Sequence, residues 1–437
     1  MSMEKINAAR AEIAATAAYR VVTEFFDADS FCEIDAFAKS GEGFAEVVAG
    51  YGTVEGMPVY AFAQNSDICG GAMSKAQAAK LKKLYGLALK TGAPVVGFYD
   101  SVGGRLTQGT ELLAGTGEVM RLASKLSGAV PQVSVVLGTC LGTNALNAAS
   151  ADFVIMTEGA KLSLDVTGKD ADAQYNAAHG NAAVIAKDES DAVAQARELV
   201  TYLPSNNLVP APQAEDRQPD GENTVCIVSK LVDAGSKLRL ADAYGDNARI
   251  RLARLGGQTV GVVRTTGGKL DCAAAAKAAR FVRFCDVFSI PVITFVDCKG
   301  FESLNSAMRL TAAYAEATTV KLSVVVGEAI GSAYVALAGT GANADIVYAL
   351  PEAVISPVNV EAAAFILAPD AMKVPTSEQQ AAADAFAKEN LSAFNAAQNG
   401  YVDGIVPFEE LRGALLSALD MLAGKRVPTV AKKHSTI

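Results

Sequence analysis

A chain of 437 residues of which 51% are apolar is too long for one ordinary hydrophobic core, and it favours two domains of about 200 residues each. The formal net charge of -9, with 38 basic and 47 acidic side chains mixed along the chain, leaves no basic stripe for a phosphate backbone, so we expect no nucleic-acid binding. With only two histidines, the chain has almost nothing from which to build a metal site or a histidine triad. Its seven cysteines are scattered, and none forms a Cys-x-x-Cys pair, which favours reduced thiols in the cytoplasm.

The first segment of the chain, Met1–Phe26, spaces its apolar residues at helical intervals with charges between them. This pattern predicts an amphipathic helix and not a signal peptide, so secretion is not implied. The uncharged run Pro131–Ala151 is long enough to span a bilayer, but its glycine, threonine, serine and asparagine residues favour a buried strand, a turn and the start of a helix. We therefore expect no direct insertion into a membrane.

In the first half of the chain, strand patterns alternate with helical ones. Pro94–Asp100 predicts a buried strand that ends at an aspartate, and Ser134–Leu146 predicts a second strand that turns through glycines into a helix of small residues. Asp152–Met156 predicts a third strand. The stretch Pro204–Asn223 is rich in proline, asparagine and charge and has no apolar periodicity, which predicts a linker near the middle of the chain.

The second half repeats these signals in the same order. Pro291–Asp297 matches the first strand, Ser323–Leu337 matches the strand with its glycine turn, and Asp345–Tyr348 matches the third strand. Gly142 and Gly331 correspond and lie 331 − 142 = 189 residues apart. A repeat of this length predicts an internal duplication with α/β layering in each half.

We expect the two domains to cover residues 1–215 and 216–437. Two further helices are predicted in the second domain, one alanine-rich at Ser377–Asn399 and one with leucines at helical spacing at Leu411–Leu422.

The two glycine turns offer a chemistry that needs no histidine. A strand that passes through Gly-x-x-x-Gly straight into a helix leaves the first amides of that helix unpaired, and such amides can stabilise a developing oxyanion. For one turn alone, tight packing of a helix on a sheet would be the better explanation. Two turns at equivalent places, each with a second glycine loop nearby at Gly103-Gly104 and at Gly300, favour two oxyanion holes.

Several long stretches resemble the biotin-dependent carboxyltransferase family. That family includes the β subunits of propionyl-CoA and acetyl-CoA carboxylases and the α subunits of sodium-pumping methylmalonyl-CoA decarboxylases. The stretches are Ala63–Leu81, Lys90–Gly109, Lys277–Phe301, Ala313–Thr318, Gly400–Arg412 and Lys432–Ile437. The resemblance implies two tandem crotonase-like domains, and a dimer in which the first domain of one subunit faces the second domain of its partner, usually within a homohexamer.

The resemblance also implies roles for individual residues. The enolate of an acyl-CoA would be held in the first domain by Gly104, Gly142 and Thr143. The ureido oxygen of biotin would be held in the second domain by Gly300, Ser332 and Ala333. Substrate contacts are expected at Gly70 and Gly71, which match a glycine pair near the coenzyme A site, and at Gly331, Val335 and Arg105, the last against a coenzyme A phosphate.

The chain also departs from the family pattern. The loop after Gly300-Phe301 is shorter and lacks a basic stretch that borders the biotin site, and Val335 stands where carboxylases of the family often have aspartate. An apolar residue there suits a decarboxylase or a non-standard acyl-CoA. Ala371–Val374 superficially matches the surroundings of a biotinylated lysine, but the following proline and helical pattern favour a loop, so biotin is expected on a separate chain.

Three functional interpretations remain open at this point. The chain can be the carboxyltransferase subunit that works with a biotin carboxyl carrier protein and a biotin carboxylase. It can be the α subunit of a decarboxylase that works with a membrane subunit, with the same chemistry in reverse. It can also be a non-catalytic paralogue, since its turns and loop are altered.

Overall fold

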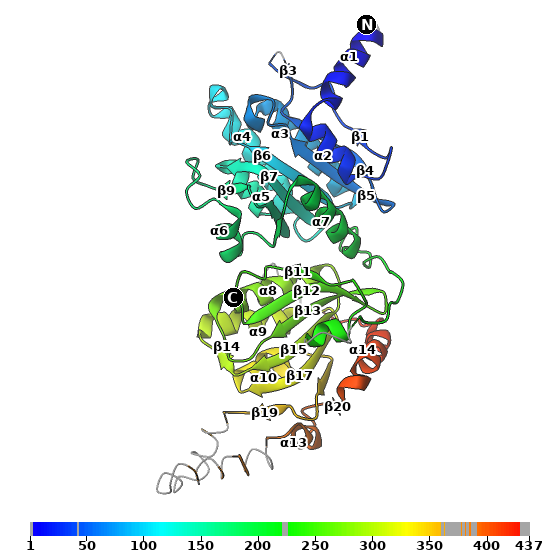
Figure 1. Ribbon diagram of the computed structural model, residues 1–437, viewed down its shortest axis with the longest axis vertical. Helices are drawn as coiled ribbons and strands as arrows, with labels where there is room; N and C mark the ends of the chain where they lie inside the picture. Colours follow the sequence, from blue (N-terminus) through cyan, green and yellow to red (C-terminus); the bar gives the residue numbers. More distant parts are fainter. Residues whose placement is uncertain are drawn as a thin grey trace. The chain divides into compact units, whose positions relative to one another are not determined.

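The computed structural model describes residues 3–41, 43–220, 226–359 and 391–428, together with residues 362, 377, 381, 384 and 385. The chain divides into two compact units, Met1–Pro212 and Gln213–Ile437 (Figure 1). The division falls inside Pro204–Asn223, the expected linker, whose described residues form no helix or strand.

The first unit is built on one sheet with strand order β1-β4-β5-β6-β7-β8-β10, and β9 pairs with the far end of β7. The first pairs are antiparallel, and every pair from β5 to β10 is parallel. The strands are β1 (Cys32–Glu33), β4 (Val47–Val54), β5 (Met57–Gln64), β6 (Val95–Ser101), β7 (Gln132–Leu141), β8 (Phe153–Thr157), β9 (Lys161–Ser163) and β10 (Val184–Ala186).

The second unit repeats this topology strand for strand. Its order is β11-β12-β13-β15-β17-β18-β20, and β19 pairs with the far end of β17. The strands are β11 (Leu238–Leu240), β12 (Ala248–Leu255), β13 (Gln258–Thr265), β15 (Val292–Cys298), β17 (Lys321–Ile330), β18 (Ile346–Ala349), β19 (Val354–Ser356) and β20 (Gly404–Ile405). The predicted α/β class and the internal duplication are confirmed.

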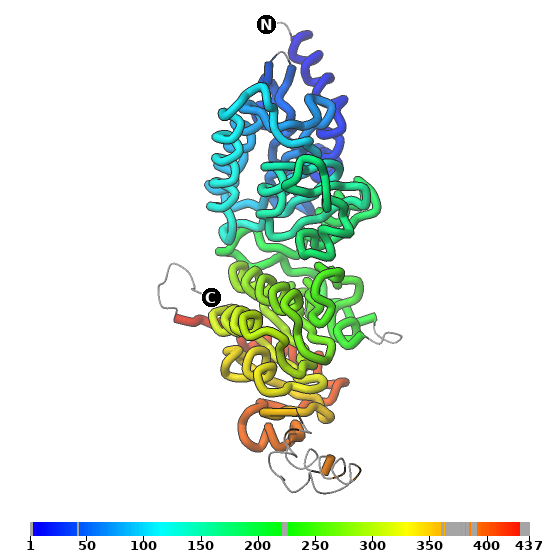
Figure 2. The backbone as a smooth tube through the Cα atoms, turned by 90° about the vertical axis from the view of Figure 1, so that its left-hand side faces the viewer, coloured from blue at the N-terminus to red at the C-terminus, as the bar shows by residue number. Residues whose placement is uncertain are grey.

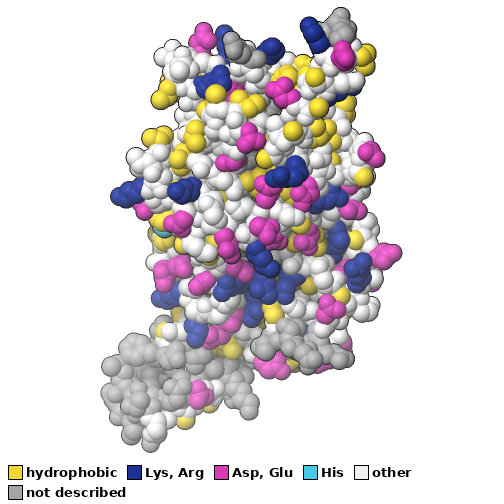
Figure 3. All heavy atoms as spheres, turned by 45° about the horizontal axis from the view of Figure 1, so that its top comes forward, with side chains coloured by type: hydrophobic (Ala, Val, Ile, Leu, Met, Phe, Trp, Pro, Cys, Tyr) yellow, Lys and Arg dark blue, Asp and Glu magenta, His cyan; other side chains and the backbone are white. Residues whose placement is uncertain are grey.

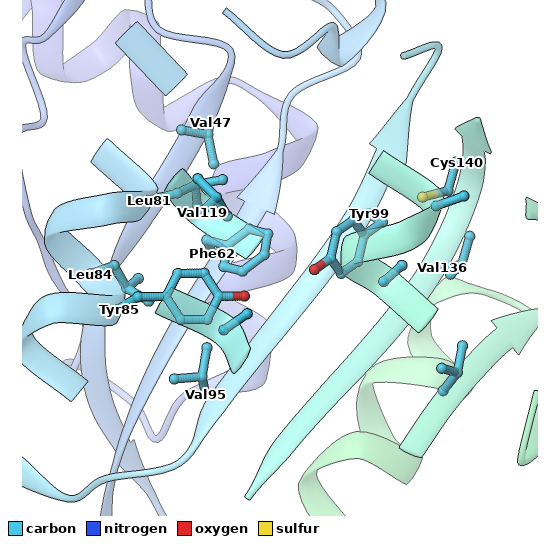
Figure 4. Close-up of a cluster of buried hydrophobic side chains, with 14 of the residues drawn as sticks. Val47, Phe62, Leu81, Leu84, Tyr85, Val95, Tyr99, Val119, Val136 and Cys140 are labelled. Carbon is cyan, nitrogen blue, oxygen red and sulfur yellow. The ribbon is translucent and has the colours of Figure 1, made fainter. Parts of the chain in front are cut away.

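Helices cover both faces of the first sheet. Consecutive residues of β6 point to opposite faces: Tyr99 contacts Phe62 within the core under α3 (Lys75–Thr91) and α4 (Glu111–Leu126), whereas Phe98 contacts Phe25 of α2 (Ala17–Phe25) on the other face. Figure 4 shows the first of these cores, with Tyr85 of α3 and Tyr99 turning their hydroxyl groups toward each other. Burial on both faces explains why the parallel strands read as nearly continuous apolar runs.

The second sheet is covered in the same way. Gly261 of β13 packs against Cys285 and Phe281 of α8 (Cys272–Val287), which lies beside α9 (Leu304–Glu316) (Figure 2). The neighbouring Val262 faces the opposite core, which it shares with Leu411 and Leu415 of α14 (Phe408–Leu422). This helix confirms the one predicted at Leu411–Leu422.

Some local predictions need correction or lie outside the described residues. The single helix expected over Met1–Phe26 is two helices, α1 (Met3–Ala14) and α2, because the Thr16 hydroxyl accepts a hydrogen bond from Tyr19 N and caps a new helix. Of the helix expected at Ser377–Asn399, the continuously described end forms α13 (Ala393–Gln398). The segment Ala371–Val374 lies outside the described residues.

Basic and acidic side chains are interspersed on the face shown in Figure 3. Among the described residues, no helix combines the length and the apolar character needed to cross a membrane.

Candidate functional site

In each unit a glycine turn joins a long parallel strand to a short helix. Gly142 joins β7 to α5 (Thr143–Ala149), and Gly331 joins β17 to α10 (Ser332–Leu337). Their φ angles are 65° and 51°, a region that favours glycine, and a side chain at Gly331 would lie 2.8 Å from the Pro357 carbonyl oxygen. The turns predicted from sequence are therefore present at equivalent places.

The amides of the two glycines are already used. Gly142 N donates to Ser163 O at 3.0 Å, and Gly331 N donates to Ser356 O at 2.7 Å, which extends the pairing with β9 and β19. This corrects the assignment of a donor role to Gly142: its amide belongs to the sheet, and its contribution is the shape of the turn.

The next amides in each turn are unpaired. Thr143 N and Asn144 N in the first unit, and Ser332 N and Ala333 N in the second, donate to no backbone or side-chain acceptor in the described part of the chain. The first amides of a helix have no partner inside it, so these groups are free for a ligand. The donors predicted at Thr143, Ser332 and Ala333 thus have the required geometry.

A loop after the neighbouring strand offers one more amide in the first unit. Val102 N donates to Gly70 O at 3.0 Å and Arg105 N donates to Met73 O at 2.9 Å, while Gly103 N donates to the Ser101 hydroxyl at 3.2 Å. Between them, Gly104 N donates to no acceptor among the described residues. The loop thus leaves the Gly104 amide unpaired, and its role as a donor to substrate stays a prediction.

The corresponding loop of the second unit requires a shift of one residue. Gly103 and Gly300 share an unusual φ, 122° and 126°, so Gly300 matches Gly103 and Phe301 matches Gly104. Burial raises the pKa of the Cys298 thiol, and a hydrogen bond from the Gly300 amide to its sulfur opposes the rise. The Gly300 amide is therefore already used. Phe301 lies opposite Leu270 in a two-stranded parallel pair, β14 (Lys269–Leu270) with β16 (Gly300–Phe301). The next amide, Glu302 N, donates to Leu270 O at 2.9 Å, and because successive amides of a strand point to opposite sides, the Phe301 amide points away from the partner strand.

The unpaired loop amide of the second unit therefore belongs to Phe301 and not to Gly300, the residue that the family resemblance implies. Aligning the two halves on Asp100 and Asp297, each the last residue but one of its strand, gives this register.

Loop and turn lie next to each other in each unit. A side chain at Gly103 would lie 3.7 Å from Leu141 O, and one at Gly300 would lie 3.7 Å from the Ser332 hydroxyl oxygen. Both segments follow the carboxyl ends of adjacent parallel strands, which meet at the same edge of a sheet. Each unit thus holds an unpaired loop amide and unpaired turn amides at one edge of its sheet.

The side chain of Arg105 is committed to the interior. Its Nε lies 2.9 Å from Oε1 of Glu46, a fully buried carboxylate that also accepts hydrogen bonds from the Ser40 hydroxyl at 2.9 Å and the Ser74 hydroxyl at 2.6 Å. The guanidinium thus neutralises Glu46 and ties the Gly104 loop to the start of α3, and the expected contact of Arg105 with a coenzyme A phosphate stays a prediction. No motif in the sequence singles out Glu46.

Gly70 and Gly71 shape the segment that packs against the same loop. Both have positive φ, 62° and 66°, and a side chain at Gly71 would collide with the Asp100 carbonyl oxygen. Their demonstrated role is close backbone packing; the expected contact with coenzyme A stays a prediction.

A cavity of about 490 Å³ adjoins the second turn. It is lined by Gly331 and Val335 together with Tyr334, Ile355, Ser356, Pro357, Leu391, Asn395, Ala396, Asn399 and Tyr401. Val335 is 52% exposed and lines this cavity, and the buried part of its side chain packs against Gly341. The lining is predominantly apolar.

Among the residues that the structure describes, titratable groups of the usual catalytic kinds do not gather at either turn. His179 is exposed, stacks on Tyr175 and lies 2.8 Å from the Tyr175 carbonyl oxygen through its Nδ1. Burial raises the pKa of the Cys140 thiol, which keeps it protonated. Searching the described residues finds no group of acidic, histidine and cysteine side chains able to hold a metal ion.

Comparison with known proteins places the chain in a family. Residues 16–437 match the model of the carboxyl transferase domain. The chain is 33% identical to the methylmalonyl-CoA decarboxylase subunit alpha of Veillonella parvula, with 95% of this chain and 92% of that protein covered. It is 35% identical to the putative propionyl-CoA carboxylase beta chain of Bacillus subtilis (strain 168), with 99% and 96% covered.

Solved structures give the same result. The chain superposes on a crystal structure of transcarboxylase 12S, described as a hexamer with hydrolysed methylmalonyl-coenzyme A bound, with a TM-score of 0.93 and 30% identity over 99% of this chain and 98% of that one. The predicted crotonase-like fold of the two halves is confirmed by this match. The duplicated sheets, their amide-bearing turns and these matches together show that the chain belongs to the carboxyl transferase domain family.

Proposed function

We propose that this chain is the carboxyltransferase subunit of a biotin-dependent enzyme and that it moves a carboxyl group between an acyl-CoA and biotin. The observation that carries the proposal is the set of unpaired backbone amides, one on a loop and one on a turn in each unit, at Gly104, Thr143, Phe301 and Ser332. When the bond between the carboxyl group and the α-carbon breaks, its electron pair stays on that carbon and the charge spreads to the thioester oxygen. Two amides aimed at that oxygen stabilise the resulting enolate without a titratable side chain.

We assign the acyl-CoA to the first unit and biotin to the second. Gly104 and Thr143 would hold the thioester oxygen, and Gly70 and Gly71 would border the coenzyme A. Phe301, Ser332 and Ala333 would hold the ureido oxygen of biotin. The relatives named for propionyl-CoA and methylmalonyl-CoA support a short acyl group.

The second unit suits a group such as biotin. Its turn adjoins a predominantly apolar cavity of about 490 Å³. Biotin supplies the ureido nitrogen that carries the carboxyl group. The chain contributes the amides that orient the ureido oxygen and the apolar walls that exclude water.

We propose a homo-oligomer in which copies of the chain cover the surfaces around the turns. Large apolar side chains are exposed near both sets of donors, and exposed apolar patches mark surfaces that bind a partner. In the first unit these include Val102, Leu106 and Val166, and in the second Leu304, Val335 and Tyr401. A hexamer agrees with the transcarboxylase 12S relative. Biotin would arrive on a separate carrier chain, and the cytoplasmic location stays a prediction.

The direction of transfer divides two versions of this proposal. A carboxylase subunit would work with a biotin carboxylase, and a decarboxylase α subunit with a membrane subunit; relatives of both kinds match at 33% and 35% identity. The third interpretation, a non-catalytic paralogue, is disfavoured because both turns keep their unpaired amides despite the altered residues.

The test uses the purified full-length protein, free biotin and methylmalonyl-CoA, with malonyl-CoA in parallel. We expect biotin-dependent decarboxylation of at least one ester, measured by loss of the substrate ester and appearance of its decarboxylated product. Absence of turnover with both esters, by a protein that is folded and binds them in calorimetry, would contradict the proposal.

A further inference from the structure

The peptide group that carries the Gly104 amide is held by an unusual number of hydrogen bonds. Its carbonyl oxygen, on Gly103, accepts from Met73 N at 2.8 Å, from Asn144 Nδ2 at 2.9 Å and from the Ser101 hydroxyl at 3.1 Å. In a trans peptide the C=O and N–H groups point in opposite directions. Three donors on the oxygen side therefore fix the Gly104 N–H in the opposite direction, and they polarise it as a donor.

The orientation of the Asn144 amide follows from its partners. A carbonyl oxygen can only accept, so the Asn144 atom that faces Gly103 is Nδ2, and its other hydrogen points to the Ser101 hydroxyl oxygen at 2.7 Å. Asn144 is only 1% exposed, and its Oδ1 has no donor among the described residues. A buried acceptor without a partner costs stability, which offsets part of what the two Nδ2 hydrogen bonds contribute to the fold.

The second unit lacks this device. Counting from Gly142 and Gly331, the residue that matches Asn144 is Ala333, whose side chain has no hydrogen-bond donor. The residue that matches Ser101 is Cys298. The Cys298 thiol lies 3.2 Å from the Gly300 carbonyl oxygen and is a weak donor. The two halves share a fold, but side-chain hydrogen bonds hold the peptide group of Gly104 more firmly than that of Phe301.

We propose that Asn144 is a positioning residue that makes the first hole the stronger of the two by fixing and polarising the Gly104 amide. The Asn144 side chain acts through the Gly103 carbonyl and not by contact with the substrate. The Ser101 hydroxyl, which accepts a hydrogen bond from Asn144 Nδ2, helps to hold this side chain in place. The inference rests on the proposed function, because it assumes that the full negative charge of an enolate develops at Gly104. A preorganised donor matters most where the charge develops, which explains why only one half of the molecule carries the asparagine.

Asn147 provides a matched control. It lies one turn later in α5, is 3% exposed, and donates through Nδ2 to the Tyr99 hydroxyl at 3.0 Å, while its Oδ1 also has no donor among the described residues. The two asparagines therefore share helix, burial and an unpaired oxygen. Only Asn144 contacts the loop that carries Gly104.

The experiment compares Asn144→Ala and Asn147→Ala in the methylmalonyl-CoA assay with free biotin. Removing a donor outright costs about 100- to 1000-fold in kcat, so loosening one should cost about tenfold. We expect Asn144→Ala to lower kcat by that factor with KM for the ester within about twofold, because a neutral thioester gains little from a polarised amide. Asn147→Ala should keep kcat within about twofold and lower the melting temperature as much as Asn144→Ala does.

Several outcomes would overturn the inference. Equal kcat losses in the two variants, an unchanged kcat in Asn144→Ala, or a loss confined to KM would show a merely structural asparagine. If Asn144→Ala does not fold, Ser101→Ala tests the same peptide, and an unchanged kcat there has the same meaning. A wild-type protein without turnover contradicts the proposed function itself, and the inference then falls with it.

Discussion

Asp100 and Asp297 occupy the same position in the two halves of the molecule, and each bridges a place where two parallel strands separate. Oδ1 of Asp100 accepts from Thr139 N at 2.9 Å, and Oδ1 of Asp297 accepts from Glu328 N at 3.1 Å. In both sheets the pairing register shifts at this residue. The aspartates therefore hold the strands together at the point where the donor loops begin.

Asp100→Ala should weaken both the fold and the reaction. Removing the carboxylate leaves the Thr139 amide without a partner, which costs about 1–3 kcal/mol, and frees the loop that carries Gly104. Thermal melting and the decarboxylation assay measure the two effects. Asp100→Asn keeps an acceptor oxygen and should retain more of both than the alanine variant; identical behaviour of the two substitutions would contradict the bridging role.

The buried Glu46–Arg105 pair makes a sharper prediction about stability. Glu46→Ala leaves the Arg105 guanidinium buried without its carboxylate, and breaking one partner of such a pair costs about 3–5 kcal/mol. We expect a large drop in melting temperature, a smaller drop for Glu46→Gln, and partial recovery when Glu46→Ala is combined with Arg105→Met. A double variant that is less stable than the single one would show that the pair does not act as a unit.

In the proposed oligomer, the acyl group bound to the first unit of one copy faces the second unit of a neighbouring copy, so Val335 should influence which acyl group is accepted. A carboxylate at this position would place a charge beside a predominantly apolar cavity, so Val335→Asp should raise KM for esters with longer apolar chains by about tenfold or more and leave malonyl-CoA less affected. Val335→Ala is the control for loss of volume alone. Equal effects on all esters would remove Val335 from the specificity-determining residues.

The pH dependence of stability has a local source at the end of α2. Burial raises the pKa of Asp27, but hydrogen bonds from Gly56, Thr53, Arg197 and Glu55 outweigh it and lower the pKa to about 2. A carboxyl group with a lowered pKa in the folded state stabilises the fold above its ordinary value of 3.8 and loses that contribution as the pH falls toward 2.

Asp27→Asn should therefore be less stable than the wild type at pH 7, by about 1 kcal/mol after solvent screening. The difference should shrink as the pH falls from about 4 to 2. Chemical unfolding at several pH values measures it. A difference that is constant over this range would mean that the shifted carboxyl group is not its cause.

Much of the fold and part of the site could be predicted from sequence. Strands such as Pro94–Asp100 and Pro291–Asp297 are buried on both faces, so their apolar runs and terminal aspartates are legible, and the repeat exposes the duplication. The break at Thr16 was missed because a single hydroxyl cap outweighs the helical spacing around it.

The finer site assignments depend on hydrogen bonds that no pattern encodes. Gly142 was expected to donate because it ends a strand, but β9 returns from distant sequence and takes its amide. Asn144 corresponds to Ala333, but the two turns also differ at the neighbouring positions, so comparing the halves does not single it out. Its partners come from a loop about forty residues earlier in the chain.

The most direct test of the account is a crystal structure of the protein with methylmalonyl-CoA bound. The account predicts the thioester oxygen within about 3 Å of both Gly104 N and Thr143 N, with the α-carbon facing the amides of Phe301 and Ser332 in a neighbouring copy. A thioester oxygen held by side chains, or placed away from both first-unit amides, would contradict it.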